Sequence, residues 1–277
     1  MKEKELIKLE HLSILQINGK GSFELLQGQI TSNMEKVSED NCVIGCICDI
    51  KGRVVSSFIL AKNEKEKNSF FIIGETKVLE ATKTILEKYQ PFYECSMRQR
   101  EDIKFYAIEE GSLISDFPES KLDISLQNYD SFFRLHYLEK KYHLVAFRES
   151  EDFKDYKISS DKLPWELDEI MNQNFEITPE VISKFTPHEL GYHLNTRIDF
   201  DKGCYTGQEI VARMHYRAKK LPELLVRSTC KGVEDLMKVY DTNNKVVGLI
   251  LSCTKTADNY KCLLSMNKNY SGQDLDF

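Results

Sequence analysis

The feature that most constrains the fold is a pair of apolar runs separated by a tight turn. Residues 42–50 (CVIGCICDI) and 53–62 (RVVSSFILAK) are rich in β-branched and other apolar side chains, and Lys51-Gly52 lies between them. Two such runs joined by two residues, the second a glycine, are typical of a β-hairpin. The sequence therefore predicts an antiparallel strand pair, and with it an antiparallel sheet.

Strand-like and helix-like segments alternate irregularly along the rest of the chain. Further strands are expected at residues 10–18, 69–75, 94–99, 102–110, 131–140, 141–149, 223–229, 245–253 and 260–266, and helices at 22–30, 76–89 and 162–173. Short strands mixed with helices in this way favour an α+β protein built on antiparallel sheets.

Composition limits the classes of function. The chain has 277 residues, 41% of them hydrophobic, enough for two or three units that share one body. It carries 38 Lys and Arg against 44 Asp and Glu, a net charge of −6, so no broad nucleic-acid surface is expected. A local basic patch could still hold an anionic ligand. This patch consists of Lys202, Arg213, Arg217, Lys219 and Lys220.

The N-terminus and the cysteines indicate a cytoplasmic protein without a membrane partner. The first ten residues (MKEKELIKLE) have no apolar signal region, and no segment approaches the ~20 apolar residues of a membrane span. In a reducing compartment, eight cysteines are core, metal-binding or reactive thiols. The spacing of Cys42, Cys46 and Cys48 matches no standard zinc or iron–sulfur site, so buried strand positions are expected and no metal site is predicted.

Residues 201–213 (DKGCYTGQEIVAR) concentrate polar and reactive groups. Thr206 and Glu209 fit a capping box, which predicts a helix that begins at Gly207. The free amides of such a helix end, together with the cation Lys202, would lower the pKa of the Cys204 thiol if its sulfur points outward. If the sulfur points into the core, Cys204 is an inert small hydrophobe. The sequence alone leaves both arrangements open.

Charged and imidazole side chains near this stretch have simpler interpretations. Glu209 and Arg213 lie four residues apart on one helix face, where a solvated ion pair is the plain alternative to a ligand contact. His188 and His193 could be two metal ligands five residues apart, but no third ligand is near them in the sequence. Both are therefore expected at the surface or in loops, and His215 is expected to be isolated.

The run KGCYTGQEIVARMHYR at 202–217 is similar to the signature K-G-C-[FY]-x-G-Q-E-x-x-x-R of the YgfZ family of folate-binding proteins. This family is related to the glycine-cleavage T-protein, an aminomethyltransferase. LLQGQIT at 25–31 and CDIKGR at 48–53 resemble further family segments, so the resemblance reaches both halves of the chain. It implies a T-protein-like folate-binding region of two interleaved α+β subdomains at 1–220, and a small, shortened C-terminal β-barrel domain at 221–277.

The resemblance also implies a site and a cofactor, tetrahydrofolate or a derivative. Trp165 is the only tryptophan; most tryptophans are core anchors, but the resemblance makes Trp165 a candidate to stack on a pterin. A second tryptophan of the family corresponds to Leu12 here. Cys204 is the expected reactive or ligand thiol. The expected cofactor-binding residues are Trp165, Lys202, Gly203, Tyr205, Gly207, Gln208, Glu209 and Arg213.

The implied function is support of iron–sulfur enzymes, including tRNA-thiolating ones, by a folate-binding protein that is not itself a conventional enzyme. A folate-dependent aminomethyltransferase is the first alternative, although this chain has Ser56 and Ser57 where the T-protein carries an aspartate for proton transfer. The second alternative is an interaction protein in which Cys204 forms a mixed disulfide or a cluster bridge with a partner, since one cysteine cannot hold a cluster alone.

Overall fold

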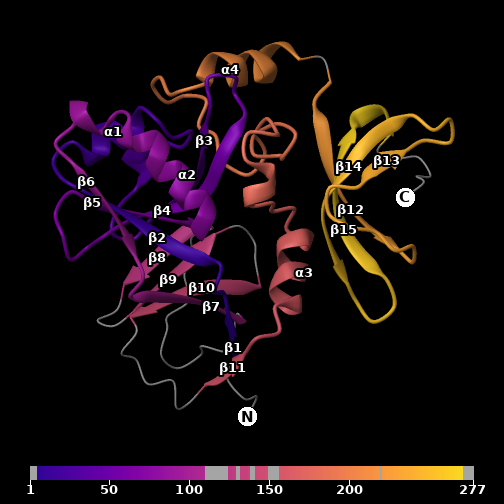
Figure 1. Ribbon diagram of the computed structural model, residues 1–277, viewed down its shortest axis with the longest axis horizontal. Coiled ribbons are helices and arrows are strands. Elements are labelled where there is room, and N and C mark those ends of the chain that lie inside the picture. Colours follow the sequence, from indigo (N-terminus) through magenta and orange to yellow (C-terminus); the bar gives the residue numbers. More distant parts are fainter. Residues whose placement is uncertain are drawn as a thin grey trace.

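The computed structural model describes residues 5–109, 124–128, 132–137, 141–148, 156–218 and 220–270. Within these residues the strands form three sheets, of five, six and four strands (Figure 1). We call them the five-stranded sheet, the six-stranded sheet and the C-terminal sheet. No helix in this described part of the chain is long and apolar enough to cross a membrane.

The five-stranded sheet contains the predicted hairpin and is antiparallel throughout. Its strands, in order across the sheet, are β3 (Val43–Cys48), β4 (Val54–Lys62), β5 (Ser69–Glu75), β2 (Leu12–Asn18) and β6 (Ser96–Arg100). Helices α1 (Ser22–Gln27) and α2 (Thr76–Glu87) bury their leucines with strand residues in a shared core. This confirms the expected hairpin and both N-terminal helices.

The six-stranded sheet packs on the five-stranded sheet. Its order is β11 (Lys157–Ser159), β1 (Glu5–Lys8), β7 (Ile103–Glu109), β10 (Tyr142–Arg148), β9 (Phe132–Tyr137) and β8 (Ile124–Asn128). Only β1 and β11 among these described pairs are parallel. Ile14 and Ile73 from one sheet and Phe105 and Leu144 from the other lie in one buried cluster, which Trp165 joins.

The C-terminal sheet has the order β12 (Pro222–Thr229), β15 (Tyr260–Asn267), β14 (Val246–Lys255) and β13 (Lys238–Tyr240). All its pairs are antiparallel, and β12 and β13 are its edges in the described residues. Leu224, Leu251 and Leu263 join a buried cluster with residues of the preceding segment, from Ile170 to Ile198. Its strands lie where short strands were expected after residue 220, and a separate domain at 221–277 stays a prediction.

Two helices connect these sheets. Helix α3 (Leu163–Met171) packs against β14 and β15, and Figure 1 shows it between the six-stranded and C-terminal sheets. Helix α4 (Gln208–Arg217) lies at the top of the view in Figure 1, beside the β3–β4 turn, and leads into β12. Single 3-10 turns are present at Met34–Lys36, Gln90–Phe92, Pro179–Val181 and Lys268–Tyr270.

Most expected elements between residues 94 and 149 are confirmed as β6, β7, β9 and β10, although their patterns were weak. Strand β8 was not expected, although the first four residues of ISLQN alternate apolar and polar side chains. Parts of the expected segments, at residues 110, 131, 138–140 and 149, lie outside the described residues, as does Lys219 of the basic patch.

Candidate functional site

A cleft of about 390 Å³ lies where the three sheets approach one another. Its lining is mixed, with apolar side chains on the sheet side and carboxylates, an amide and a lysine on the side of α3. The lining residues are His11, Leu12, Ile59, Ile73, Gly74, Glu75, Leu144, Lys162, Trp165, Glu166, Glu169, Ile170, Asn174, Phe175, Glu176, Ile177, Thr178, Asp235, Ser252, Cys253 and Thr254.

Helix α3 holds one wall of the cleft in place. Pro164 in its first turn has a fixed φ and no amide hydrogen to satisfy, which favours a helix start at this point. The Thr254 hydroxyl donates to Glu166 Oε2 at 2.7 Å, which ties α3 to β14. The backbone amides of Lys141 and Tyr142 donate to the Asp168 carboxylate at 3.2 and 3.1 Å, which ties α3 to the start of β10. Trp165, 6% exposed, is thereby fixed between the core and the cleft.

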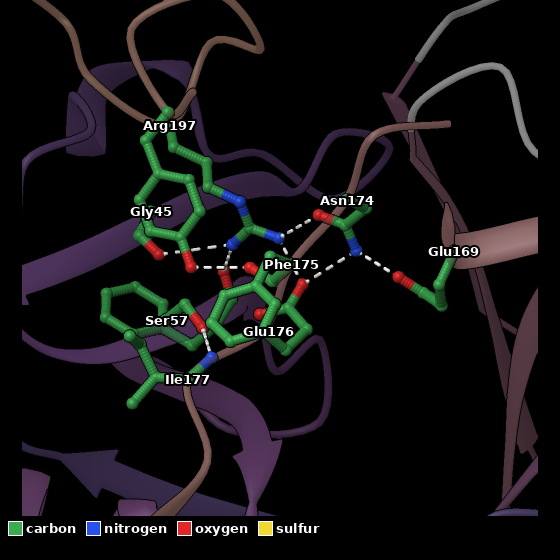
Figure 2. A network of polar contacts seen from close by, with 10 residues as sticks. Gly45, Ser57, Glu169, Asn174, Phe175, Glu176, Ile177 and Arg197 are labelled. Carbon is green, nitrogen blue, oxygen red and sulfur yellow. Dashed lines mark hydrogen bonds and ion pairs between the residues drawn. The ribbon is translucent and has the colours of Figure 1, made fainter. Parts of the chain in front are cut away.

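Another carboxylate of the cleft lining, Glu176, is held by a buried arginine. Arg197 is fully buried, and its guanidinium forms an ion pair with Glu176, whose side chain is 35% exposed (Figure 2). Asn174 accepts from Arg197 Nη2 at 2.9 Å through Oδ1, and its Nδ2 donates to Glu176 Oε1 at 3.0 Å and also to Glu169. A buried charge requires such pairing, so the network fixes where the Glu176 carboxylate lies.

The backbone around Glu176 is fixed from both sides. The Ile177 amide donates to Ser57 Oγ at 2.8 Å, as Figure 2 shows. The Tyr192 hydroxyl donates to the Phe175 carbonyl at 2.6 Å, and the Arg197 guanidinium lies 4.9 Å from the Tyr192 ring centroid. Burial raises the pKa of Tyr192, so its hydroxyl keeps its proton and remains a donor. The cleft therefore presents a preorganised carboxylate within a mixed, partly apolar lining.

The loop before α4 is attached to the five-stranded sheet unit by Lys202. Its ammonium donates to the carbonyl of Gln27, at the end of α1, at 2.7 Å and to that of Ile30, just beyond α1, at 2.6 Å. It also lies 5.3 Å from the Tyr205 ring centroid. Burial lowers the pKa of Lys202 to about 8. Tyr205 is buried too, whereas Gly203 and Cys204 are exposed. The buried neighbours hold a loop that presents one thiol to solvent.

No protein-family model matches the chain. Individual relatives do match. It is 29% identical, over 78% of its length and 69% of the relative's, to the tRNA-modifying protein YgfZ of Colwellia psychrerythraea strain 34H. It is 22% identical to the YgfZ protein of Aliivibrio fischeri strain MJ11, over 98% of this chain and 87% of that one. These relatives support a YgfZ-family assignment for the chain.

A solved structure supports a T-protein-like fold for this chain. The glycine cleavage system aminomethyltransferase T from Bartonella henselae superimposes with a TM-score of 0.73, covering 97% of this chain and 79% of that protein, at 12% identity. At this identity the likeness shows the fold alone. The expected T-protein-like α+β fold is therefore confirmed.

The structure separates two groups of residues that the sequence led us to expect at one site. Trp165 lines the cleft, but residues 202–213 of the YgfZ signature contribute nothing to the lining drawn from the described chain. Gln208 is half-buried on α4, while Glu209 and Arg213 are exposed there. The cofactor-binding roles expected for Lys202, Gly203, Tyr205, Gly207, Gln208, Glu209 and Arg213 stay predictions.

The predicted capping box is wrong. The N-cap of α4 is Gly207 in the left-handed region, with φ of +83°, and has no side chain to accept a hydrogen bond. The Thr206 hydroxyl instead donates to Gln29 Oε1 at 2.9 Å. A Cβ at Gly207 would lie 2.4 Å from the Asp49 carbonyl oxygen, so the close approach of this loop to the β3–β4 turn requires glycine. The helix still begins within one residue of its predicted start.

Sequence reasoning placed His188 and His193 correctly in a loop but missed how close the histidines lie. His188 is fully buried in that loop, and His215, which was expected to be isolated, lies near both. The His188 ring centroid lies 4.8 Å from that of His193 and 6.1 Å from that of His215. The folding of residues 186–194 against α4 brings these rings together, and local sequence cannot report such a contact.

The polar residues of the cleft were likewise missed. Asn174, Glu176 and Arg197 belong to segments without regular helix or strand periodicity, and the ion pair joins positions 21 residues apart. One weak signal was available. Phe175-Glu176-Ile177 places a carboxylate between two apolar residues, a pattern typical of a charged group at the edge of a core.

Proposed function

We propose that this YgfZ-family chain binds a reduced folate, tetrahydrofolate or a derivative, in the cleft between α3 and the three sheets. The observation that carries this proposal is the Glu176 carboxylate, held by buried Arg197 on one wall of a cleft that Trp165 also lines. The cleft volume of about 390 Å³ lies within the range of roughly 300–1,000 Å³ common for small-molecule sites.

The chemistry of a reduced folate fits these side chains. The aminopyrimidinone edge of a pterin offers two adjacent N–H donors, and a fixed carboxylate is a suitable bidentate acceptor for them. We assign this contact to Glu176. The flat ring system suits the aromatic face of Trp165 and the apolar side chain of Leu12. The anionic glutamate tail would meet Lys162, a cation of the cleft lining.

The tRNA-related part of the proposal comes from the relatives. Proteins named tRNA-modifying protein YgfZ match most of this chain, and we propose that it too supports tRNA modification, by assisting iron–sulfur enzymes that thiolate tRNA. The Cys204 loop, exposed and outside the cleft lining, is the surface we assign to contact with those protein partners. Eight free cysteines fit a reducing compartment such as the cytoplasm.

Aminomethyl transfer is not part of the proposal. Ser57 lies in the stretch where the T-protein carries its aspartate, and its hydroxyl accepts a hydrogen bond from the Ile177 amide. A neutral hydroxyl engaged in this way cannot supply a carboxylate for proton transfer. Its contact with Ile177 positions the segment that contains Glu176.

An anaerobic titration with tetrahydrofolate, followed by Trp165 emission and corrected for folate absorbance, tests the cleft. We expect saturable quenching, and a loss of roughly tenfold or more in affinity for Glu176→Gln, because hydrogen bonds to charged groups contribute about 1.5–3 kcal/mol. Glu180→Gln, at an exposed carboxylate outside the cleft lining, is the matched control and should leave affinity unchanged.

Two further outcomes are decisive. Absence of saturable quenching in the wild-type chain would refute the folate proposal. Arg213→Ala tests the role inferred for that residue from the sequence, because weaker folate binding by this variant would extend the site to α4. If Arg213→Ala binds folate like wild type and Lys162→Met binds it more weakly, the glutamate tail is assigned to the cleft.

A further inference from the structure

The cleft that we assign to a reduced folate carries mainly negative charge. Among the described residues, its lining contains five carboxylate side chains but only one lysine and no arginine. Burial and the nearby Lys162 lower the pKa of His11 to about 4, so this imidazole adds no positive charge at neutral pH. The carboxylates of the lining are Glu75, Glu166, Glu169, Glu176 and Asp235.

Two of these carboxylates are held by consecutive residues of β14. The Thr254 hydroxyl donates to Glu166 Oε2 at 2.7 Å, and the backbone amide of Cys253 donates to Asp235 Oδ1, also at 2.7 Å. Both donors are neutral, so they fix the two carboxylates without cancelling their charge. Glu166 and Asp235 therefore place two fixed negative charges in the part of the lining next to β14.

Glu176 differs from these two carboxylates, because buried Arg197 matches its charge. Its assigned partner is the pterin, which offers N–H donors. Lys162 is then the one cation that the described lining offers to the glutamate tail. It is the N-cap of α3, and Glu166 follows it by four residues, about one helical turn. A tail that reaches Lys162 therefore has Glu166 as a neighbour.

The length of the glutamate tail sets the charge of a folate. Tetrahydrofolate ends in one glutamate, and each γ-linked glutamate that is added to it brings one further carboxylate. Lys162 offsets part of the charge of the first glutamate. Additional carboxylates meet no second cation in the described lining, and Glu166 and Asp235 repel them.

We propose that this cleft selects reduced folates with a single glutamate and discriminates against polyglutamylated forms. The inference rests on the proposed folate function and specifies the form of the ligand. Glu166 and Asp235 are the residues that determine the selectivity. Their effect on a tail is stronger than in bulk water, because a cleft lined by charge of one sign focuses the electric field.

Anaerobic titrations with tetrahydrofolate and with its triglutamate form, both followed by Trp165 emission, test this selectivity. At ~0.01 M salt, where the screening length is ~30 Å, we expect the triglutamate to bind about three- to tenfold more weakly. At ~1 M salt, where the screening length falls to ~3 Å, the two affinities should converge. This salt dependence distinguishes charge repulsion from a steric effect of the longer tail.

Two isosteric variants test the assigned residues. Glu166→Gln and Asp235→Asn each keep an oxygen that can accept the hydrogen bond from β14, so both should fold. In each variant the ratio of the two affinities at low salt should fall toward one, and the double variant should show the smallest ratio. Glu180→Gln, at an exposed carboxylate outside the cleft lining, is the matched control and should keep the wild-type ratio.

The outcomes separate this inference from the folate proposal. Equal affinities for the two forms in the wild-type chain, or tighter binding of the triglutamate, would overturn the inference and leave the folate proposal in place. A wild-type ratio in the double variant would likewise overturn the roles of Glu166 and Asp235. Absence of saturable quenching by both forms would instead refute folate binding, and the inference with it.

Discussion

The ion pair between Arg197 and Glu176 joins a fully buried guanidinium to a carboxylate at the wall of the cleft. The two residues belong to segments that otherwise have no regular secondary structure. Arg197 also donates to the carbonyls of Gly45 and Phe58, both at 3.4 Å, so the five-stranded sheet supports the same contact. The pair therefore links the core of that sheet to the position of Glu176.

Replacing Arg197 by methionine should destabilise the protein by about 3–5 kcal/mol, the usual effect of removing one partner from a buried ion pair. The variant would leave Glu176 without its cation and would remove the guanidinium contacts to the Gly45 and Phe58 carbonyls. Urea denaturation measures the change in the free energy of unfolding. Arg213→Met, at an exposed arginine, should stay within about 0.5 kcal/mol of wild type. Equal stability of the two variants would contradict a structural role for the pair.

Gly207→Ala should destabilise the chain by about 1–3 kcal/mol, because φ of +83° disfavours a side chain and the new Cβ would clash with the Asp49 carbonyl. Gly203→Ala is the matched control in the same loop, since a Cβ there meets no atom within 4 Å among the described residues. Thermal or urea unfolding compares the two variants. A similar, small effect at both positions would show that α4 does not depend on its close contact with the β3–β4 turn.

The sequence predicted local structure well because the signals for it are local. The hairpin at 42–62 follows from two apolar runs and a Lys51-Gly52 turn, and the start of α4 was right to within one residue. Contacts between distant segments were not predictable. The sequence around Glu176 contains no signal that predicts its ion pair with Arg197. The periodicity of the sequence likewise does not predict that His215 lies near His188. The capping box failed for the same reason, because the packing of Gly207 against Asp49 overrides a local motif.

The stability of the wild-type protein should rise between about pH 8 and pH 10.5 through Lys202. Its folded-state pKa is lowered from 10.5 to about 8, so in this window the unfolded chain binds more protons than the folded one. The disadvantage of a buried charge is fully present below pH 8 and disappears above the unfolded pKa. At ~1.4 kcal/mol per pKa unit, the gain is of order 3 kcal/mol.

The pH dependence of urea denaturation for wild type minus that for Lys202→Met isolates this effect from other titrating groups. The neutral amine still has two N–H donors for the Gln27 and Ile30 carbonyls, so the loop contacts persist at high pH. A difference between the two profiles that stays flat from pH 8 to 10.5 would show that the Lys202 ammonium is solvated in the folded state.

Cys204 should be the most informative thiol of the chain, because the fold exposes it while burying most others. Brief alkylation of the native protein should modify Cys204 and Cys230, whereas Cys42, Cys46, Cys48 and Cys262 react only after denaturation. Mass spectrometry of the digested protein identifies the labelled sites. Protection of Cys204 in the native chain would place its sulfur in the core.

Cys204→Ser should then separate the two parts of the proposed function. Because the thiol lies outside the cleft lining, the variant should fold and bind tetrahydrofolate like wild type. In a strain that lacks its own YgfZ protein, the same variant should fail to restore tRNA thiolation, with Cys230→Ser, at an equally exposed cysteine, as the control that restores it. Full complementation by Cys204→Ser would make the thiol dispensable, and parallel loss of folate binding would instead assign Cys204 to the ligand site.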